Sequence, residues 1–185
     1  QLDSLERVSK EVISCTLCPL SAGRIKAVPG EGSSQAKVMI VGEAPGYNED
    51  LQGRPFVGSA GQLLDVLLES IGLRRESVYI TNIVKCRPPN NRPPRVLERK
   101  TCRPYLLRQI GIIKPAIVCP MGNTALNDLM GRLSISNAHG KAMEKDGIIY
   151  LPLYHPAAAL YDVSLKDILL LDFKALGILL GTGRP

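Results

Sequence analysis

Cysteine residues are the first sign of chemistry in this sequence. Cys15 and Cys18 form a C-x2-C pair, and Cys86 and Cys102 follow far downstream with 15 residues between them. Four thiolates can enclose one metal centre, because zinc and iron–sulfur clusters both take four soft ligands in a near-tetrahedral array. Zinc ribbons usually repeat the short pair, so the widely split second pair favours an iron–sulfur cluster. Two disulfides are the alternative, and they are uncommon where no secretory signal is seen.

A second group of reactive residue types comprises Glu43, Asn82 and His155. Glu43 lies in the turn Gly42-Glu43-Ala44-Pro45-Gly46, where glycines let backbone amides approach a ligand closely. The spacings G-x-G-x-x-G and G-x-x-x-x-G-K-[ST] are absent, which argues against a dinucleotide or a P-loop phosphate. Asn82 lies in an apolar segment, where a buried amide without a partner costs about 1–3 kcal/mol, so a ligand is a plausible partner. His155 alone could equally cap a helix, and His139 is expected to be a turn residue without a role.

The elements that must position these residues alternate along the chain. Apolar, β-branched runs predict strands at residues 37–41, 78–84, 116–119 and 148–153, and hydrophobic periodicity predicts helices at 2–13, 60–71, 96–113, 123–130 and 165–180. This alternation is typical of an α/β fold whose sheet lies between helices. Ligands of such folds bind beyond the carboxyl ends of the strands, so Glu43, Asn82 and His155 should face one crevice. Cys119, inside the third strand, is expected to pack in the core.

The length and composition favour one globular domain over residues 1–185. Apolar residues make up 45% and charged residues 22%, and no apolar run reaches the roughly 18 residues of a spanning helix. We therefore expect a cytoplasmic protein without a membrane partner. The net charge of +6 favours a polyanionic partner without naming one. Residues 87–95 hold four prolines and three arginines, which predicts a stiff basic loop.

The chain carries, in order, Cys15-x2-Cys18, Gly42-Glu43-Ala44-Pro45-Gly46, Glu49-Asp50, Gly53-Arg54-Pro55-Phe56-Val57-Gly58, Thr81-Asn82-Ile83-Val84-Lys85-Cys86-Arg87-Pro88-Pro89, Asn91-Arg92, Cys102 and His155-Pro156-Ala157. This series resembles family 4 uracil-DNA glycosylases, the iron–sulfur type of thermophilic prokaryotes. The resemblance implies a three-layer α/β/α sandwich with a central four-stranded parallel sheet. It also implies one 4Fe-4S cluster and no catalytic metal. The implied cluster ligands are Cys15, Cys18, Cys86 and Cys102.

The resemblance further implies a pocket for a uracil flipped out of DNA. Phe56 would stack on the base, a contact worth roughly 1–3 kcal/mol, and its loop position is expected to expose it to the ligand. Asn82 would pair with uracil O4 and N3–H, a pattern that cytosine reverses. Gly46 and Glu49 are expected to exclude the methyl group of thymine. The other predicted pocket residues are Gly42 and Ala44.

His155 is implied to contact uracil O2. When the N1–C1′ bond breaks, the base gains negative charge, so a fixed donor at O2 stabilises the transition state more than the ground state. Glu43 and Asn91 are predicted to position the attacking water; Glu43 can also accept a proton, whereas Asn91 can only orient the water or hold Glu43. Another family of uracil glycosylases carries an aspartate where this chain has Ala44, so no base acts there. The nearest lysine, Lys85, is not placed for a Schiff base, which predicts a monofunctional enzyme that leaves an abasic site.

The expected partner is uracil-containing DNA, single- or double-stranded, bound by a monomer. Leu160 and Tyr161 are predicted to enter the space left by the flipped base. Two alternatives stay open: a capture protein that retains uracil, although no histidine stands between Cys86 and Cys102 to act as its nucleophile, and a non-catalytic metal-containing module. Basic residues near the cysteines are expected to bind phosphates with salt-sensitive affinity. They are Arg87, Arg92, Arg95, Arg99, Lys100 and Arg103.

Overall fold

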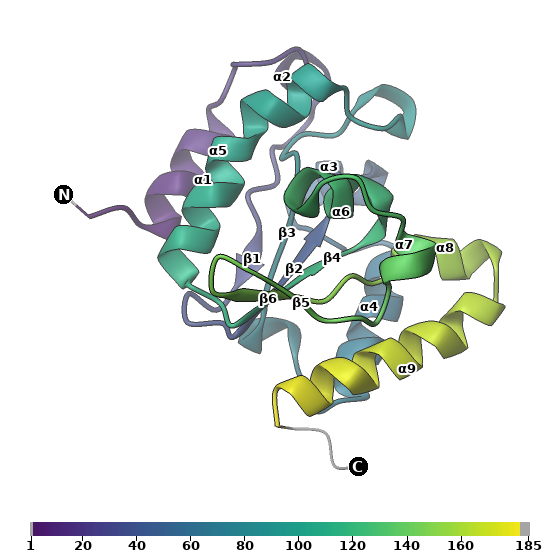
Figure 1. Cartoon of the computed structure of the whole chain (residues 1–185). Helices are drawn as coiled ribbons and strands as arrows, with labels where there is room; N and C mark the ends of the chain where they lie inside the picture. Colours follow the sequence, from purple (N-terminus) through teal and green to yellow (C-terminus); the bar gives the residue numbers. More distant parts are fainter. Residues whose placement is uncertain (1, 182–185) are drawn as a thin grey trace.

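A six-stranded sheet forms the centre of the computed structural model, which describes residues 2–181 (Figure 1). The strand order is β1-β3-β2-β4-β6-β5. The four middle strands are parallel, as predicted, and the short β1 and β5 pair antiparallel at the two edges. Two or three residues are too few to show an alternating pattern, so the edge strands were not predicted. The strands are β1 Glu31–Gly32, β2 Val38–Gly42, β3 Tyr79–Asn82, β4 Ile117–Pro120, β5 Met143–Lys145 and β6 Ile148–Tyr150.

Five long helices occupy the segments that hydrophobic periodicity predicted. They are α1 Leu5–Ile13, α4 Ser59–Glu69, α5 Val96–Ile113, α6 Gly122–Met130 and α9 Ser164–Leu179. The first begins later than predicted because the Ser4 side chain caps it by accepting a hydrogen bond from the amide of Arg7. Four short helices were not predicted: α2 Leu20–Gly23, α3 Tyr47–Gln52, α7 Ile135–Ala138 and α8 Pro156–Tyr161. Across residues 2–181, no helix combines the length and the apolar character needed to cross a membrane.

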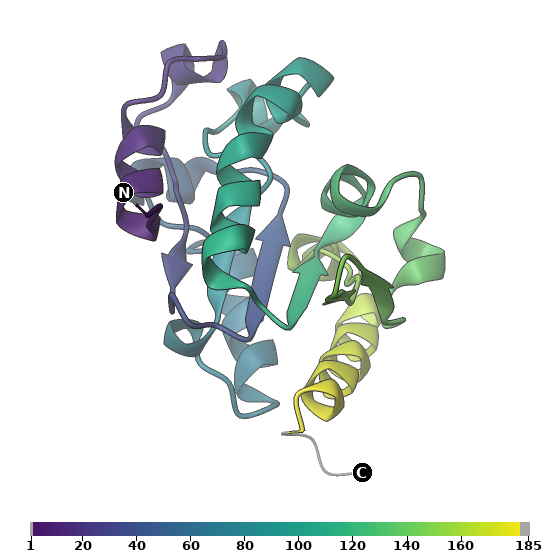
Figure 2. The same ribbon diagram turned by 60° about the vertical axis from the view of Figure 1, so that its left-hand side comes forward.

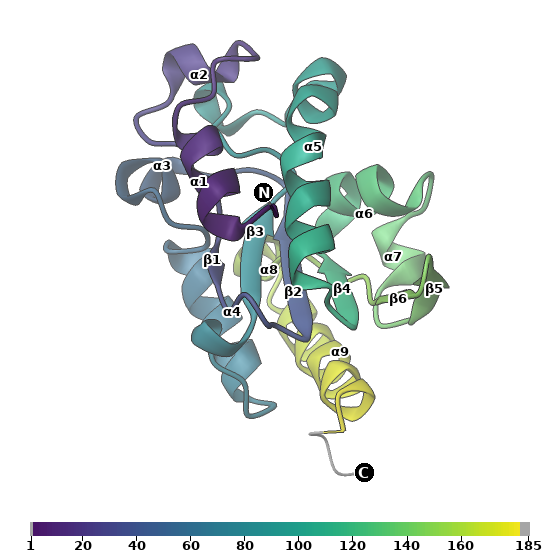
Figure 3. The ribbon, with the colours of Figure 1, turned by 90° about the vertical axis from the view of Figure 1, so that its left-hand side faces the viewer.

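Helices cover both faces of the sheet, which divides the core into two hydrophobic clusters (Figures 2 and 3). Met39 and Val41 of β2 belong to the cluster that contains residues of α1, α5 and α6, whereas Val38 and Ile40 belong to the cluster with α4 and α9. This division follows from the two-residue period of a strand, which sends successive side chains to opposite faces. The predicted three-layer α/β/α sandwich is confirmed.

Parallel pairing brings the carboxyl ends of the middle strands to one edge of the sheet. Gly42 of β2 lies opposite Asn82 of β3. On the other side of β2, Val41 lies opposite Pro120 of β4. The segment after β6 continues along β4, where Leu153 bridges to Met121. The turns that follow β2, β3, β4 and β6 therefore begin at the same edge, and this edge contains the candidate site.

Candidate active site

A small pocket opens beside Asn82 at the carboxyl edge of the sheet. Its volume is about 50 Å³, and its wall includes Ala44, Phe56 and His155. The Asn82 residue is 2% exposed, and its side-chain amide has no hydrogen-bond partner within the part of the chain that the structure describes. A Cβ atom on Gly42 would lie 2.5 Å from the Asn82 side-chain oxygen, so only glycine leaves room for the amide. An amide donor and acceptor are thus available to a ligand in the pocket.

Phe56 forms a wall of this pocket from a buried position. Its ring stacks on the ring of His155, with centroids 5.4 Å apart and an interplanar angle of 24°. Its backbone has a φ of 50°, in the left-handed region, and its carbonyl accepts a hydrogen bond of 2.9 Å from Arg75. Phe56 lines the pocket, as its loop position was expected to allow, although the whole residue is only 6% exposed. The missing side chain of Gly42 is what lets the ring pack so closely against β2.

Glu49 links the turn after β2 to the loop that carries Phe56. One carboxylate oxygen accepts a hydrogen bond from the amide of Gly46 at 3.0 Å, and the other accepts from the amides of Val57 and Gly58, each at 2.9 Å. Glu49 lines the pocket, as predicted. Because backbone amides hold both oxygens, the side chain contributes shape to the wall rather than a free carboxylate. Exclusion of the thymine methyl group by Gly46 and Glu49 stays a prediction.

His155 is the N-cap of α8, and this position defines its tautomer. Its Nδ1 accepts a hydrogen bond of 3.1 Å from the amide of Ala157. A neutral imidazole that accepts at Nδ1 carries its proton on Nε2. Burial lowers the pKa of His155 to about 4, and the carboxylate of Glu49 opposes this shift only partly. At neutral pH, His155 is therefore an uncharged donor at the pocket wall.

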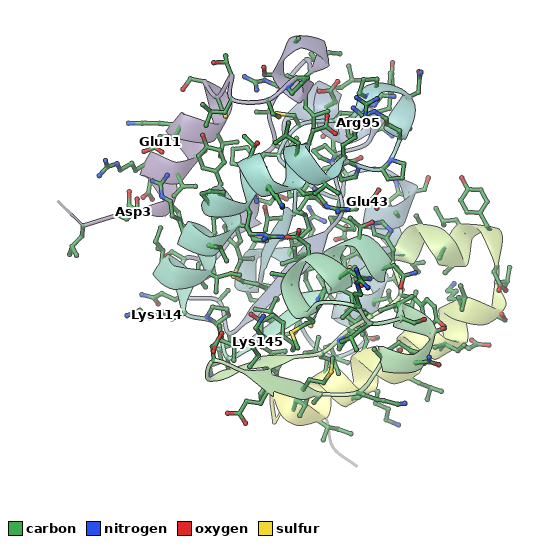
Figure 4. All side chains as sticks on the ribbon, turned by 45° about the horizontal axis from the view of Figure 1, so that its top comes forward. Asp3, Glu11, Glu43, Arg95, Lys114 and Lys145 are labelled. Carbon is green, nitrogen blue, oxygen red and sulfur yellow. The ribbon has the colours of Figure 1, made fainter. Side chains whose placement is uncertain are left out.

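A wider cleft of about 400 Å³ adjoins the small pocket beside Asn82, called the base pocket below, and shares Ala44 and His155 with it. Glu43, Asn91 and Thr124 all line this cleft, so the crevice expected from the strand ends is confirmed. In Figure 4, Glu43 lies near the middle of the face turned toward the viewer, and Arg95 lies farther out, on the basic loop. Ala44 occupies the position where a carboxylate would stand in the other uracil glycosylase family, and no base acts from it.

Thr124 holds Glu43, whereas Asn91 does not. The Thr124 hydroxyl donates a short hydrogen bond to one carboxylate oxygen of Glu43. The side-chain oxygen of Asn91 accepts a hydrogen bond of 2.8 Å from Arg87, whose guanidinium lies over the ring of Tyr47. Of the two roles predicted for Asn91, orienting water stays open, and holding Glu43 is not seen among residues 2–181. Sequence reasoning missed Thr124 because no motif relates it to Glu43, 81 residues earlier.

The four predicted ligand cysteines surround a third cavity, of about 20 Å³. Cys15 and Cys18 lie between α1 and α2, Cys86 follows β3, and Cys102 lies on α5. All five cysteines are free thiols, which argues against the disulfide alternative, and Cys119 is fully buried in the core as predicted. Within the described residues, no three His, Cys, Asp or Glu side chains converge closely enough to hold a single metal ion. Four thiols around one cavity are a donor set that both zinc and an iron–sulfur cluster accept.

Comparison with known proteins agrees with this geometry. The model of the uracil DNA glycosylase superfamily matches residues 29–173. The type-4 uracil-DNA glycosylase of Sulfurisphaera tokodaii is 50% identical over 184 residues, which cover 94% of this chain and 83% of the relative. The type-4 enzyme of Archaeoglobus fulgidus is 42% identical over 193 residues, which cover 100% and 97%. The type-4 enzyme of Thermotoga maritima is 44% identical over 175 residues, which cover 92% and 91%.

The chain belongs to the type-4 uracil-DNA glycosylases. Membership in this family makes it a DNA glycosylase, a hydrolase that excises uracil from DNA in base excision repair. The family, the enzyme class and the reaction predicted from the motifs are thereby confirmed. The capture protein and the non-catalytic module are both set aside.

Acidic partners neutralise several of the basic residues that were predicted to bind DNA in this glycosylase. Arg92 forms two hydrogen bonds with Glu98, at 2.8 and 2.9 Å, and Arg103 binds Asp128, which Arg99 also approaches. These residues contribute to the architecture of the basic loop and α5. Of the six basic residues predicted to bind phosphates, Arg95 and Lys100 lie exposed and form no side-chain hydrogen bond to the described residues.

Exposed apolar residues extend from α8 beside the base pocket of the glycosylase. Tyr161 is 93% exposed and Leu160 is 49% exposed. Both lie on α8, the helix that His155 caps. Their insertion into DNA stays a prediction.

The expectation that His139 has no role is wrong. Its Nδ1 lies 2.7 Å from a carboxylate oxygen of Asp172 on α9, and its ring contacts that of Tyr154. His139 therefore attaches the turn after α7 to the last helix. The partner lies 33 residues away, beyond the reach of local sequence patterns.

The state of His155 can be tested by nitrogen-15 NMR. We expect its ring to carry a proton on Nε2 at pH 7 and to titrate with a pKa of about 4. Because this pKa lies below the ordinary value of 6.5, a falling pH protonates His155 in the unfolded chain before it protonates His155 in the folded chain. The stability due to this group is complete above about pH 6.5 and is lost as the pH falls through about 4. A titration near pH 6.5, or no difference between wild type and His155→Gln in that stability profile, would contradict the assignment.

Proposed function

We propose that this glycosylase recognises uracil through the side-chain amide of Asn82 and stabilises the departing base through Nε2–H of His155. The observation that supports the proposal most strongly is the buried amide of Asn82, which has no partner among the described residues and faces the pocket. Uracil offers a carbonyl at O4 and a donor at N3, which match the amide NH2 and the amide oxygen. Cytosine reverses both groups, so it would leave a buried donor and acceptor unpaired, at about 1–3 kcal/mol each.

The chemistry breaks the N1–C1′ bond and adds water to C1′. As the bond lengthens, the base becomes anionic and its O2 gains charge, which a neutral imidazole donor can stabilise without starting as a charged group. We propose that Glu43 orients the water and accepts its proton as the oxygen joins C1′. Asn91, held by Arg87, is proposed to complete the water site. Phe56 supports the flipped base by stacking.

The reaction is proposed to stop at the abasic site. A lyase step would need a free amine to form a Schiff base with C1′. Lys85, the nearest lysine in sequence, is 1% exposed. Its ammonium donates hydrogen bonds to the side chains of Thr81 and Gln109 and to the carbonyl of Asn82. Burial lowers the pKa of Lys85 to about 7, but its side chain lines neither the pocket beside Asn82 nor the wide cleft, so this amine is not placed to attack C1′.

We propose that one 4Fe-4S cluster binds between the four thiols. The cavity that they line, and the poor convergence on a single ion, support a multi-atom group. Arg24 donates hydrogen bonds to Cys86 Sγ at 3.3 Å and to the carbonyl of Cys15 at 2.7 Å, so a positive charge already faces the ligand set. When bound, the cluster supplies cross-links rather than catalysis. It would tie the N-terminal segment and α5 to the end of β3, next to Asn82.

DNA binding is proposed to use the basic loop and α8. Arg87 and Arg95 would contact phosphates, whereas Arg92 would hold the basic loop through its pair with Glu98. Leu160 or Tyr161 would fill the space left by the flipped base. We propose that residues 1–185 act as one domain and as a monomer, in the cytoplasm.

Single-turnover excision from a uracil-containing oligonucleotide tests the proposed roles. We expect alkali-labile sites with the wild type and a rate constant lowered by roughly 10²–10³-fold in His155→Ala, as in other enzymes that lose one preorganised donor. Asn82→Ala should lose both rate and the preference for uracil over cytosine. Lys37→Met, an exposed change before β2, is the control. Wild-type rates in both variants, or a persistent covalent adduct, would contradict the proposal.

Iron analysis of anaerobically purified protein tests the metal centre. We expect about four iron atoms per chain, and we expect Cys102→Ala to lose iron and the visible absorbance of the cluster. Cys119→Ala is the matched control, because it removes a thiol from the core without removing a proposed ligand, and it should retain full iron content. One zinc ion per chain, or equal iron in both variants, would overturn the assignment.

A further inference from the structure

Thr124 stands at the wall of the wide cleft, in the first turn of α6. The helix begins directly after β4, and the amide of Met121 donates a hydrogen bond of 2.9 Å to the carbonyl of Val41 in β2. Glu43 follows β2 by one residue. Backbone pairing at the edge of the sheet therefore brings Thr124 to Glu43, and their contact does not depend on a long flexible segment.

The hydrogen bond from Thr124 leaves Glu43 with one engaged and one available oxygen. Thr124 Oγ1 donates to Oε2, and Oε1 makes no hydrogen bond to any residue that the structure describes. Neither of the other side-chain amides in the cleft is bonded to Glu43: the oxygen of Asn91 accepts from Arg87, and the oxygen of Asn123 accepts from the amide of Ile135. Thr124 is thus the side chain that orients Glu43 within residues 2–181.

Orientation matters for a glutamate that must position a water molecule. The side chain has three rotatable bonds, and a carboxylate that rotates freely spends little time at the angle that an attacking water requires. A donor to one oxygen fixes the plane of the carboxylate and directs the other oxygen toward the cleft. Hydrogen bonds to ionised groups are also stronger than those between neutral groups, so this contact can hold against solvent.

We propose that Thr124 is a positioning residue, which orients Glu43 so that its free oxygen holds the water that adds to C1′. This inference rests on the proposed role of Glu43. Thr124 itself need not touch the base or the sugar. Its contribution should appear in the chemical step, and not in the binding of DNA.

The test compares Thr124→Val, which removes the hydroxyl at nearly constant shape, with Thr124→Ser, which keeps it. At saturating enzyme, we expect Thr124→Val to lower the single-turnover rate constant roughly tenfold, the usual effect of losing one hydrogen bond to a charged group. Thr124→Ser should retain a rate close to that of the wild type. The dissociation constant for abasic-site DNA should be the same in all three proteins, because binding precedes the step that Glu43 serves.

A double-mutant cycle with Glu43→Gln separates this inference from its premise. If Thr124 acts through Glu43, adding Thr124→Val to Glu43→Gln should change the rate constant by less than twofold. An undiminished tenfold loss in the double variant would overturn the inference, as would weaker DNA binding at an unchanged rate. A wild-type rate in Glu43→Gln would instead remove the proposed role of Glu43. Asn127→Ala, which removes side-chain hydrogen bonds to the carbonyl of Asn123 and to the backbone of Leu133, should leave the rate unchanged and so exclude general loosening of the helix.

Discussion

The parallel pairing of β2 with β3 is the constraint on which the site depends. This register sets Gly42 opposite Asn82, and the absent side chain of Gly42 leaves the space that the Asn82 amide and the ring of Phe56 share. The Asn82 amide makes no side-chain hydrogen bond to the described residues and opens onto the pocket, so its donor and acceptor stay available. A ligand with a matching acceptor and donor can pair with both groups at once, whereas a ligand with the reversed pattern would bury them unpaired, at about 1–3 kcal/mol each.

The surrounding structure keeps the pocket rigid. Glu49 joins two loops through three backbone amides. Phe56 has a left-handed backbone conformation that residues other than glycine rarely adopt, and a hydrogen bond from Arg75 to its carbonyl holds it there. Burial keeps His155 neutral, so its donor faces the base without a charge that water would have to solvate. Preorganised dipoles of this kind need little rearrangement when charge develops on the base. Cys86 follows Asn82 by four residues, so a cluster bound to the four thiols, as proposed, would support the end of the strand that carries Asn82.

Sequence reasoning succeeded where the physics is local or periodic. Helices such as α1, with its apolar stripe, and the four parallel strands follow from apolar patterns. The rule that ligands bind beyond the carboxyl ends of parallel strands correctly brought Glu43, Asn82 and His155 to one edge. It failed where tertiary contacts decide: nothing in the loop sequence signals that the ring of Phe56 packs against Gly42 and stacks on His155. The contacts from Thr124 to Glu43 and from His139 to Asp172 join distant segments, and no spacing rule signals them. Arg92 and Arg103 resembled free cations until the acids that pair with them, Glu98 and Asp128, were located in space.

A crystal structure of the protein with bound uracil tests the central claim most directly. The account predicts that uracil lies in the pocket with O4 about 2.9 Å from the Asn82 nitrogen, N3 about 2.9 Å from the Asn82 oxygen, and O2 within hydrogen-bond distance of His155 Nε2. The uracil ring should stack on Phe56. Uracil bound elsewhere, or bound in this pocket with the Asn82 amide unpaired, would contradict the account.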